Sequence, residues 1–245
     1  MLKLVIHMLT TLNMSPEQIS NRLEHENSKI RISVNTIYRG IERNEIRDTV
    51  KPYLRKKYRG NRSHSGENNR GKLVGAVSIT ERPEAAAQRS EIGHWEADTV
   101  VGPKKSGCIL TLVDRCSRYL LAKRLKSSKA EDVTKGIIEL LKSVPKKYVL
   151  SVTPDCGKEF FGYKTVTETL GVPFYFCHPG SPWERPTNEN TNGLLRQYFP
   201  KGFSFERYFD DEFLRAFALI NIRPRKCLNW FSPIEIFYGT SLHLT

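Results

Sequence analysis

The order of strand-like and helix-like segments after residue 90 constrains the fold of this chain more than any other feature of its sequence. Three strand-like segments come first, HWEADTVVG (94–102), CILTLVDRC (108–116) and YLLAKRL (119–125). An amphipathic helix follows, and its apolar stripe consists of Ala130, Val133, Ile137, Leu140 and Val144. The chain then alternates between a strand at 148–155, a helix at 158–171, an extended segment at 172–180, a helix from 186 and a last helix at 211–221. This order predicts an α/β fold in which a mixed sheet has helices on its faces.

Residues 1–46 lack this alternation and predict a small all-α unit of three helices. Ser15, Pro16 and Gln18 have the pattern of a capping box at a helix start, and Ser33 begins another helix. In a helix-turn-helix, the early residues of the last helix face the DNA major groove. Four residues are therefore candidates for DNA contact: Asn35, Thr36, Tyr38 and Arg39. An ordinary helical hairpin has the same pattern and stays an alternative.

The chain carries 39 lysine and arginine residues against 26 aspartate and glutamate residues, a formal net charge of +13. Such a charge favours a polyanionic partner, and we expect nucleic acid. Nine of these cations lie within residues 47–72, namely Arg47, Lys51, Arg55, Lys56, Lys57, Arg59, Arg62, Arg70 and Lys72. We interpret the segment as a flexible basic linker that contacts DNA phosphates, with Lys56 and Lys57 as candidates. A linker that is merely well solvated is the alternative.

The cysteines and the longest apolar runs restrict where the protein works. The five cysteines are widely spaced and form no CxxC pair, which argues against a zinc site and against a disulfide framework. This cysteine usage is typical of the reducing cytosol. No apolar run approaches the length of a membrane span. We therefore expect a cytoplasmic protein with no membrane partner.

Three carboxylates are candidates for a catalytic metal site. Asp98 lies inside a predicted strand, and Asp155 ends another strand, at the edge where α/β sheets bind ligands. Glu189 lies on the polar face of the helix that begins near Pro186. Converging carboxylates suit Mg²⁺ or Mn²⁺, and two such ions support in-line displacement at a phosphodiester. We therefore expect Asp98, Asp155 and Glu189 to hold two of these ions.

Each of the three carboxylates also has a purely structural alternative. Asp98 could pair with Arg115 or Arg118, Asp155 could begin a turn, and Glu189 could be solvated. The role of three further residues near the strands stays open between support of the site, packing and rival ligation: His94, Glu96 and Asp114.

The helix that carries Glu189 is amphipathic. Its polar face holds Glu189, Asn192, Gly193 and Arg196, and Leu194, Leu195 and Tyr198 lie opposite. A glycine inside a helix costs about 1 kcal/mol relative to alanine, so Gly193 counts against a merely solvated face and favours a reason such as close approach to the backbone. The polar residues on and after this helix are candidates for DNA phosphate or base-edge contacts: Asn188, Asn192, Arg196 and Lys201.

Five long motifs in order give this chain a resemblance to a known family. They are IGHWEADTVVG, LTLVDRCSR, TPDCGKEF, SPWERPTNENTNGLLRQYFPKG and NIRPRKCLNWFSPIEIF. They closely resemble bacterial insertion-sequence transposases of the IS-thirty type, and the match runs from Ser15 onward. The resemblance implies a helix-turn-helix remnant at 1–46, a basic linker at 47–81 and an RNase H-like, integrase-like core at 82–245.

The resemblance also implies an activity and its partners. A DDE triad would fall on Asp98, Asp155 and Glu189, with Mg²⁺-dependent cleavage at element ends and joining of the 3′-hydroxyl to target DNA. The partners implied are terminal inverted repeats, target DNA and further copies of this chain in a synaptic complex. Cys156 and Pro186 depart from the family pattern, where a polar residue and a glycine are usual.

Family members usually have an additional helix-turn-helix ahead of the SPEQIS motif, so we expect this chain to be N-terminally truncated. Poor recognition of the terminal repeats would follow. Two other functions stay open: a non-catalytic DNA-binding protein that inhibits full-length transposase, and a simple phosphodiesterase or ribonuclease on the same fold.

Overall fold

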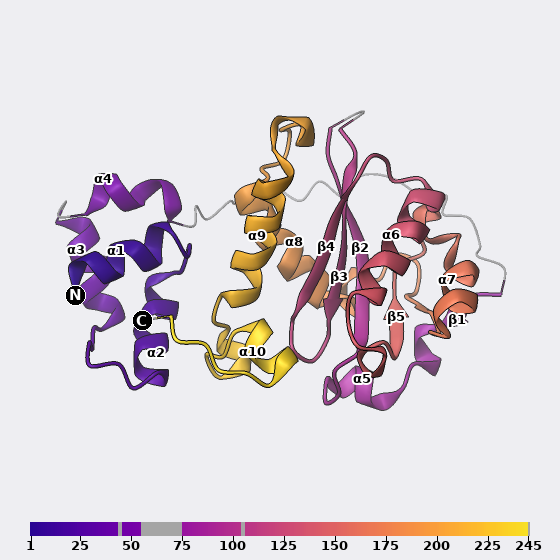
Figure 1. The fold of residues 1–245 in the computed structure, drawn as a ribbon, viewed down its shortest axis with the longest axis horizontal. Coiled ribbons are helices and arrows are strands. Elements are labelled where there is room, and N and C mark those ends of the chain that lie inside the picture. The colour runs from indigo at the N-terminus through magenta and orange to yellow at the C-terminus, as the bar shows by residue number, and fades with distance from the viewer. Residues whose placement is uncertain (44–45, 55–74, 104–105, 245) are drawn as a thin grey trace. The chain divides into compact units, whose positions relative to one another are not determined.

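Four strands form the central sheet of the computed structural model, which describes residues 1–43, 46–54, 75–103 and 106–244 (Figure 1). They are β2 (His94–Val101), β3 (Cys108–Asp114), β4 (Leu120–Leu125) and β5 (Ser151–Thr153). The spatial order is β4-β3-β2-β5, in which β2, β3 and β4 pair antiparallel and β5 joins β2 in parallel. The predicted mixed sheet is confirmed, although β5 is shorter than its apolar sequence indicated.

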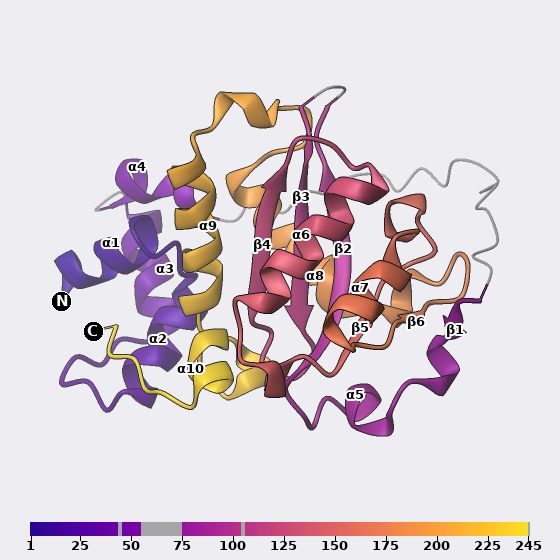
Figure 2. The ribbon, with the colours of Figure 1, turned by 45° about the vertical axis from the view of Figure 1, so that its right-hand side comes forward.

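Helices cover both faces of this sheet, as the alternation of its side chains requires (Figure 2). The covering helices are α6 (Ala130–Lys142) and α8 (Pro186–Tyr198). Asp98 points toward α8, where it accepts a hydrogen bond from Asn192. Its neighbour Thr99 pairs across the sheet with Leu110, which therefore lies on the other face. A Cβ atom added to Gly136 of α6 would lie 2.8 Å from Leu110, so α6 packs closely on that other face.

Further elements of this part of the chain lie outside the four-stranded sheet. They are β1 (Val77–Ser78), α5 (Glu84–Gln88), α7 (Tyr163–Leu170) and β6 (Tyr175–Phe176). Strands β1 and β6 form a parallel two-stranded sheet, and α7 packs against α6. Gly171 ends α7 in the left-handed conformation at φ 69°, as its position after the apolar stripe predicts.

The chain divides into two compact units, and the first contains both chain ends. It combines Met1–His64 with Leu219–Thr245, and the second unit is Ser65–Ala218. The helices of the first unit are α1 (Leu2–Thr10), α2 (Pro16–His25), α3 (Val34–Glu42), α4 (Arg47–Val50) and α10 (Pro233–Tyr238), and α9 (Asp210–Ile222) crosses the boundary. The boundaries expected from the sequence, at 46 and 81, did not include this association of the last residues with the first.

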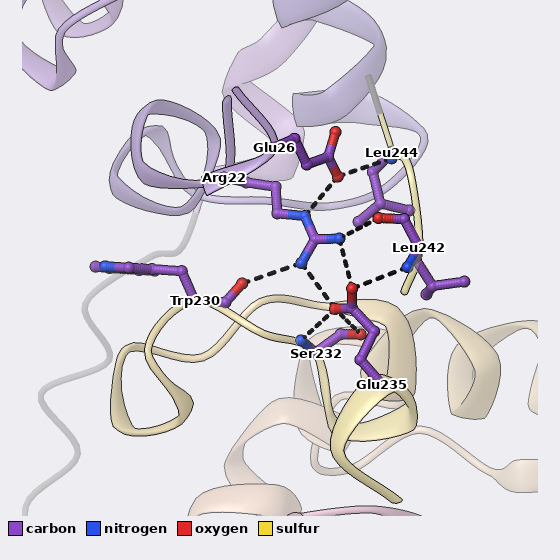
Figure 3. A network of polar contacts seen from close by, with 7 residues as sticks. All are labelled: Arg22, Glu26, Trp230, Ser232, Glu235, Leu242 and Leu244. Carbon is purple, nitrogen blue, oxygen red and sulfur yellow. Dashed lines mark hydrogen bonds and ion pairs between the residues drawn. The ribbon is translucent and has the colours of Figure 1, made fainter. Parts of the chain in front are cut away.

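A buried ion pair attaches the C-terminal residues to α2 (Figure 3). The Arg22 guanidinium donates to both carboxylate oxygens of Glu235, at 2.7 and 2.9 Å, and neither residue is more than 3% exposed. Arg22 also donates to Glu26 and to the main-chain oxygens of Trp230 and Leu242. Both charges therefore have several partners, as a buried ion pair requires.

No helix within the described ranges combines the length and the apolar character needed to cross a lipid bilayer.

Candidate catalytic site

The register of two strands brings Asp98 and Asp155 together. Glu96 of β2 lies opposite Thr153 of β5 in a parallel pair, so the positions two residues further along each chain are also neighbours. Asp98 is on β2, and Asp155 follows the end of β5. Each carboxylate also accepts a hydrogen bond from a nearby main-chain N–H group. Asp98 accepts from Thr99, and Asp155 accepts from Gly157 in a turn, both at 2.8 Å.

Arg185 lies between the two aspartates. Its Nη1 is 3.6 Å from Oδ1 of Asp98, and its Nη2 is 3.2 Å from Oδ2 of Asp155. Nη1 also donates to the main-chain oxygen of Ala97 at 2.9 Å. The partner of Asp98 is therefore neither Arg115 nor Arg118, the two alternatives that the sequence suggested. A charge inside a strand predicts a cationic partner, but local sequence does not say which of several arginines it is.

The electrostatics of the pair follow from burial and from this arginine. Burial raises the pKa of the Asp98 carboxyl, while Arg185, the Thr99 N–H and Asn192 act in the opposite direction. Burial alone would lower the pKa of Arg185, but Asp98 and Asp155 together raise it above its ordinary value. The guanidinium is therefore protonated. The charge that burial disfavours in this site is that of the Asp98 carboxylate.

A second buried ion pair fixes the start of α8. Glu96 accepts a hydrogen bond from Arg115 and, at 2.9 Å, the main-chain N–H of Asn188 in the first turn of the helix. A carboxylate at this end of a helix is favoured by the unpaired N–H groups and by the helix dipole. Glu96 is fully buried, so its role is to hold α8 against β2. This answers one question that the sequence left open.

Glu189 lies one turn before Asn192 on the exposed side of α8. Within the described part of the chain, its carboxylate makes no hydrogen bond or ion pair. The same part contains no group of three His, Cys, Asp or Glu side chains close enough to hold a metal ion. The structure thus brings together Asp98 and Asp155, and it leaves Glu189 outside that pair.

The surroundings of the two aspartates suit a divalent cation in their chemistry. Nδ2 of Asn192 donates to Asp98, while its Oδ1 is buried with no hydrogen-bond partner among the described residues. This unpartnered oxygen and the two carboxylates are oxygen donors, the kind of group that Mg²⁺ and Mn²⁺ prefer. The guanidinium of Arg185 shows that positive charge is favourable between the carboxylates.

The other titratable residues near the strands have structural roles. Asp114 is fully buried and accepts hydrogen bonds from the main-chain N–H groups of Gly93 and Ser117 and from the Ser117 hydroxyl. His94 contacts Ser151 through Nδ1 at 2.7 Å, and burial lowers its pKa. Asp114 is therefore committed to the turn after β3 and is not a rival to Asp98.

The predicted DNA contacts lie in different environments. The four candidates on α3 are all exposed, on the side opposite the buried Ile37 and Ile41: Asn35, Thr36, Tyr38 and Arg39. Lys201 is exposed, and Arg196 donates to the main-chain oxygen of Val101. Asn188 is only 1% exposed, and this burial removes its side chain from the surface. Lys56 and Lys57 lie outside the described residues.

Comparison with known proteins gives matches to a family, to individual proteins and to a solved structure. Residues 88–182 match the family described as integrase core domain. The transposase InsI for insertion sequence element IS30A of Escherichia coli (strain K12) is 39% identical over 244 residues, which cover 96% of this chain and 63% of that protein. The chain thus spans less than two thirds of this relative's length. The transposase for insertion sequence element IS4351 of Bacteroides fragilis is 37% identical over 225 residues, covering 91% of this chain and 68% of that protein.

Among solved structures, the catalytic core domain of BIV integrase is similar, with a TM-score of 0.47 and 19% sequence identity. The similarity covers 61% of this chain and 95% of that one.

Proposed function

This chain belongs to the IS30-type family of insertion-sequence transposases, and we propose that it cleaves DNA at insertion-sequence ends and transfers the freed strand into target DNA. The fold class expected for this family is confirmed, with an RNase H-like α/β core and helices at the N-terminus. The observation that best supports the reaction is the register of β2 and β5, because it makes Asp98 and Asp155 neighbours.

In the proposed reaction, Asp98, Asp155 and Glu189 would hold Mg²⁺ or Mn²⁺, and Asn192 would offer its amide oxygen. Two such ions, when bound, activate a hydroxyl nucleophile and stabilise the leaving oxygen of an in-line displacement. Asp98 and Asp155 are held by the sheet, and Glu189 is held by α8, whose start is fixed by Glu96. Rigid elements of this kind give a catalytic site its precision.

The proposed chemistry has two displacements of the same type. A water molecule first attacks the phosphodiester at the element end, the P–O3′ bond breaks, and the 3′ oxygen leaves as a hydroxyl. This 3′-hydroxyl then attacks a phosphodiester of the target, a new P–O bond forms, and the target's own 3′ oxygen leaves with a proton. Neither step needs a covalent bond between protein and DNA, so neither needs a nucleophilic side chain.

DNA is the proposed partner, in the form of terminal inverted repeats and target DNA. The net charge of +13 and the exposed side of α3 support this partner, and Arg196 and Lys201 add positive charges on and after the helix that carries Glu189. Because lysine and arginine contacts release counterions from DNA, we expect the affinity to fall steeply as salt rises. Pairing of two element ends would require a homo-oligomer.

A strand-transfer assay tests the proposal. The chain is incubated with a labelled element end, a plasmid target and Mg²⁺ or Mn²⁺, and nicked and joined products are separated on a gel. We expect both products from the natural protein and neither from Asp98→Asn, Asp155→Asn or Glu189→Gln. Glu139→Gln is the matched control, because Glu139 is an exposed residue of α6 whose carboxylate pairs with Lys123.

The alternatives give different products in the same assay. DNA binding without any metal-dependent nick would identify a non-catalytic inhibitor, and hydrolysis without joining would identify a simple nuclease. Full activity of Glu189→Gln would show that Glu189 is not the third carboxylate of the catalytic site.

A further inference from the structure

The position proposed for the cation holds the positive charge of Arg185 in this structure. The guanidinium contacts three acceptors: the main-chain oxygen of Ala97 and one carboxylate oxygen each of Asp98 and Asp155. Arg185 is 9% exposed, whereas an arginine that only solvates its charge lies at the surface. This side chain is therefore part of the site.

A metal ion and this guanidinium compete for the same oxygens. The two carboxylates carry two negative charges. One guanidinium neutralises one of these charges, and one divalent cation neutralises both. Arg185 contacts Oδ1 of Asp98 and Oδ2 of Asp155, so it occupies one oxygen of each carboxylate. An ion bound to these two oxygens would take the place of the guanidinium nitrogens that contact them. Both cannot occupy this position together.

The side chain of Arg185 is held in the site through the end of its guanidinium. Arg185 is the N-cap residue of α8, ahead of the first helical turn. Its Nε is buried and has no hydrogen-bond partner among the described residues, so only the two Nη atoms are held. Rotation about the side-chain bonds therefore frees both aspartates while the backbone of α8 stays in place.

We propose that Arg185 is an internal counter-ion that occupies the cation site of the metal-free protein and that a divalent cation displaces when it binds. The inference rests on the proposed function, since it concerns the same two aspartates. Its consequence is that Arg185 weakens metal binding, because the ion must first break the contacts of the guanidinium with Asp98 and Asp155.

Titration of the full chain with Mn²⁺ alone tests this inference without DNA and without activity. The free ion is measured by its electron paramagnetic resonance signal. We expect Arg185→Gln to bind Mn²⁺ about 5- to 150-fold more tightly than the natural protein, the usual range for two coupled binding events. Arg215→Gln is the matched control, because Arg215 is an exposed residue of α9 and its loss changes the net charge equally. We expect no more than about a twofold change from it.

A second variant covers the case in which Arg185→Gln does not fold. Arg185→Lys keeps the positive charge but lacks the planar fork whose two Nη atoms reach the two carboxylates, and we expect it to bind Mn²⁺ with intermediate affinity. Unchanged or weaker binding by both Arg185 variants would overturn the inference, because Arg185 would then not compete with the ion.

Asp98→Asn and Asp155→Asn separate this inference from the proposed function. If both variants lose Mn²⁺ binding and Arg185→Gln gains none, the metal site stands and only the role of Arg185 is wrong. If neither aspartate variant changes Mn²⁺ binding, the proposed metal site is wrong, and the inference that Arg185 competes with the ion is wrong as well.

Discussion

At Asp98, burial and ion pairing act in opposite directions on one carboxylate. Burial raises its pKa, and Arg185 compensates only in part. The folded state favours the protonated form of Asp98. A neutral side chain at this position would therefore be better for stability alone. Such mismatches are typical of catalytic and metal-binding positions.

Asp98→Asn should therefore stabilise the metal-free protein. Because the pKa in the folded state is above the ordinary value of 3.8, the charged carboxylate destabilises the fold increasingly as the pH rises through the raised pKa. In EDTA we expect a gain of about 0.5–2 kcal/mol in unfolding free energy at pH 7 and almost none below pH 3.8. Urea unfolding at both pH values measures it, with Glu139→Gln as a control that stays near zero. A loss of stability at pH 7 would contradict the prediction.

The pKa of Glu235 is shifted in the opposite direction from that of Asp98. Burial would raise its pKa, but hydrogen bonds from Arg22, Leu242 and Ser232 lower it from 4.5 to about 2. Its contribution to stability, about 3 kcal/mol by linkage, is complete above pH 4.5 and is lost as the pH falls through about 2.

Glu235→Gln should remove this acid dependence and destabilise the first unit by about 3–5 kcal/mol at pH 7, because Arg22 keeps a buried charge without its partner. Urea unfolding between pH 7 and pH 2, followed by circular dichroism, measures both effects. Glu24→Gln is the control, since Glu24 is an exposed residue of α2 whose pair with Arg31 spans 4.0 Å. An equal acid slope for Glu235→Gln and the natural protein would refute the assignment.

At the scale of elements, α8 combines a fixed start with an open outer side. Glu96 holds its first turn, and Leu194 and Leu195 are buried beneath it. Gly193 lies on the outer side, and a Cβ atom added there would meet nothing within 4 Å. The close approach that the sequence indicated is therefore not made by the described chain, which leaves room for a partner.

Gly193→Ala tests this interpretation through two measurements. Alanine is the better helix former and meets no neighbour, so we expect about 1 kcal/mol of added stability in thermal or urea unfolding. If DNA approaches the backbone at this point, the same variant should bind DNA more weakly at fixed salt. Greater stability with unchanged DNA affinity would show that DNA does not approach the α8 backbone at Gly193.

The elements were more predictable from sequence than the contacts between them. The capping box at Ser15 is present as expected, and Ser232, Pro233 and Glu235 repeat its pattern at the start of α10. Such signals are local, because a cap and its helix share one turn. The pairing of Arg22 with Glu235 spans 213 residues, and nothing in either neighbourhood indicates the other.

The candidate site shows the same limit. Period-two alternation and strand ends singled out Asp98 and Asp155, because these signals depend on a few consecutive residues. The register that makes them neighbours, and the choice of Arg185 over Arg115, depend on packing of separate segments. Sequence patterns singled out candidate residues and left open which of them are in contact.

At the scale of the whole molecule, the helical unit that carries the exposed α3 residues is completed by the last residues of the chain. Leu244 packs against its apolar core, and the main-chain N–H of Leu244 donates to Glu26. Leu242 accepts from Arg22 and donates to Glu235 through its main chain. The proposed DNA-reading surface therefore depends on residues that follow the second unit in sequence.

Removal of residues 241–245 should loosen the first unit and spare the second. The deletion takes away three main-chain hydrogen bonds to charged groups, each worth about 1.5–3 kcal/mol before water replaces them, so we expect a net loss of about 2–4 kcal/mol. Amide hydrogen exchange resolves the two units, because protection should fall in α1, α2 and α3 and stay unchanged in β3 and α6. Leu242→Ala is the matched control: it keeps every main-chain bond, and its loss should be clearly smaller. If the deletion left exchange in α2 unchanged, the C-terminal residues would lie on the helical unit without stabilising it, and DNA binding through α3 would not depend on them.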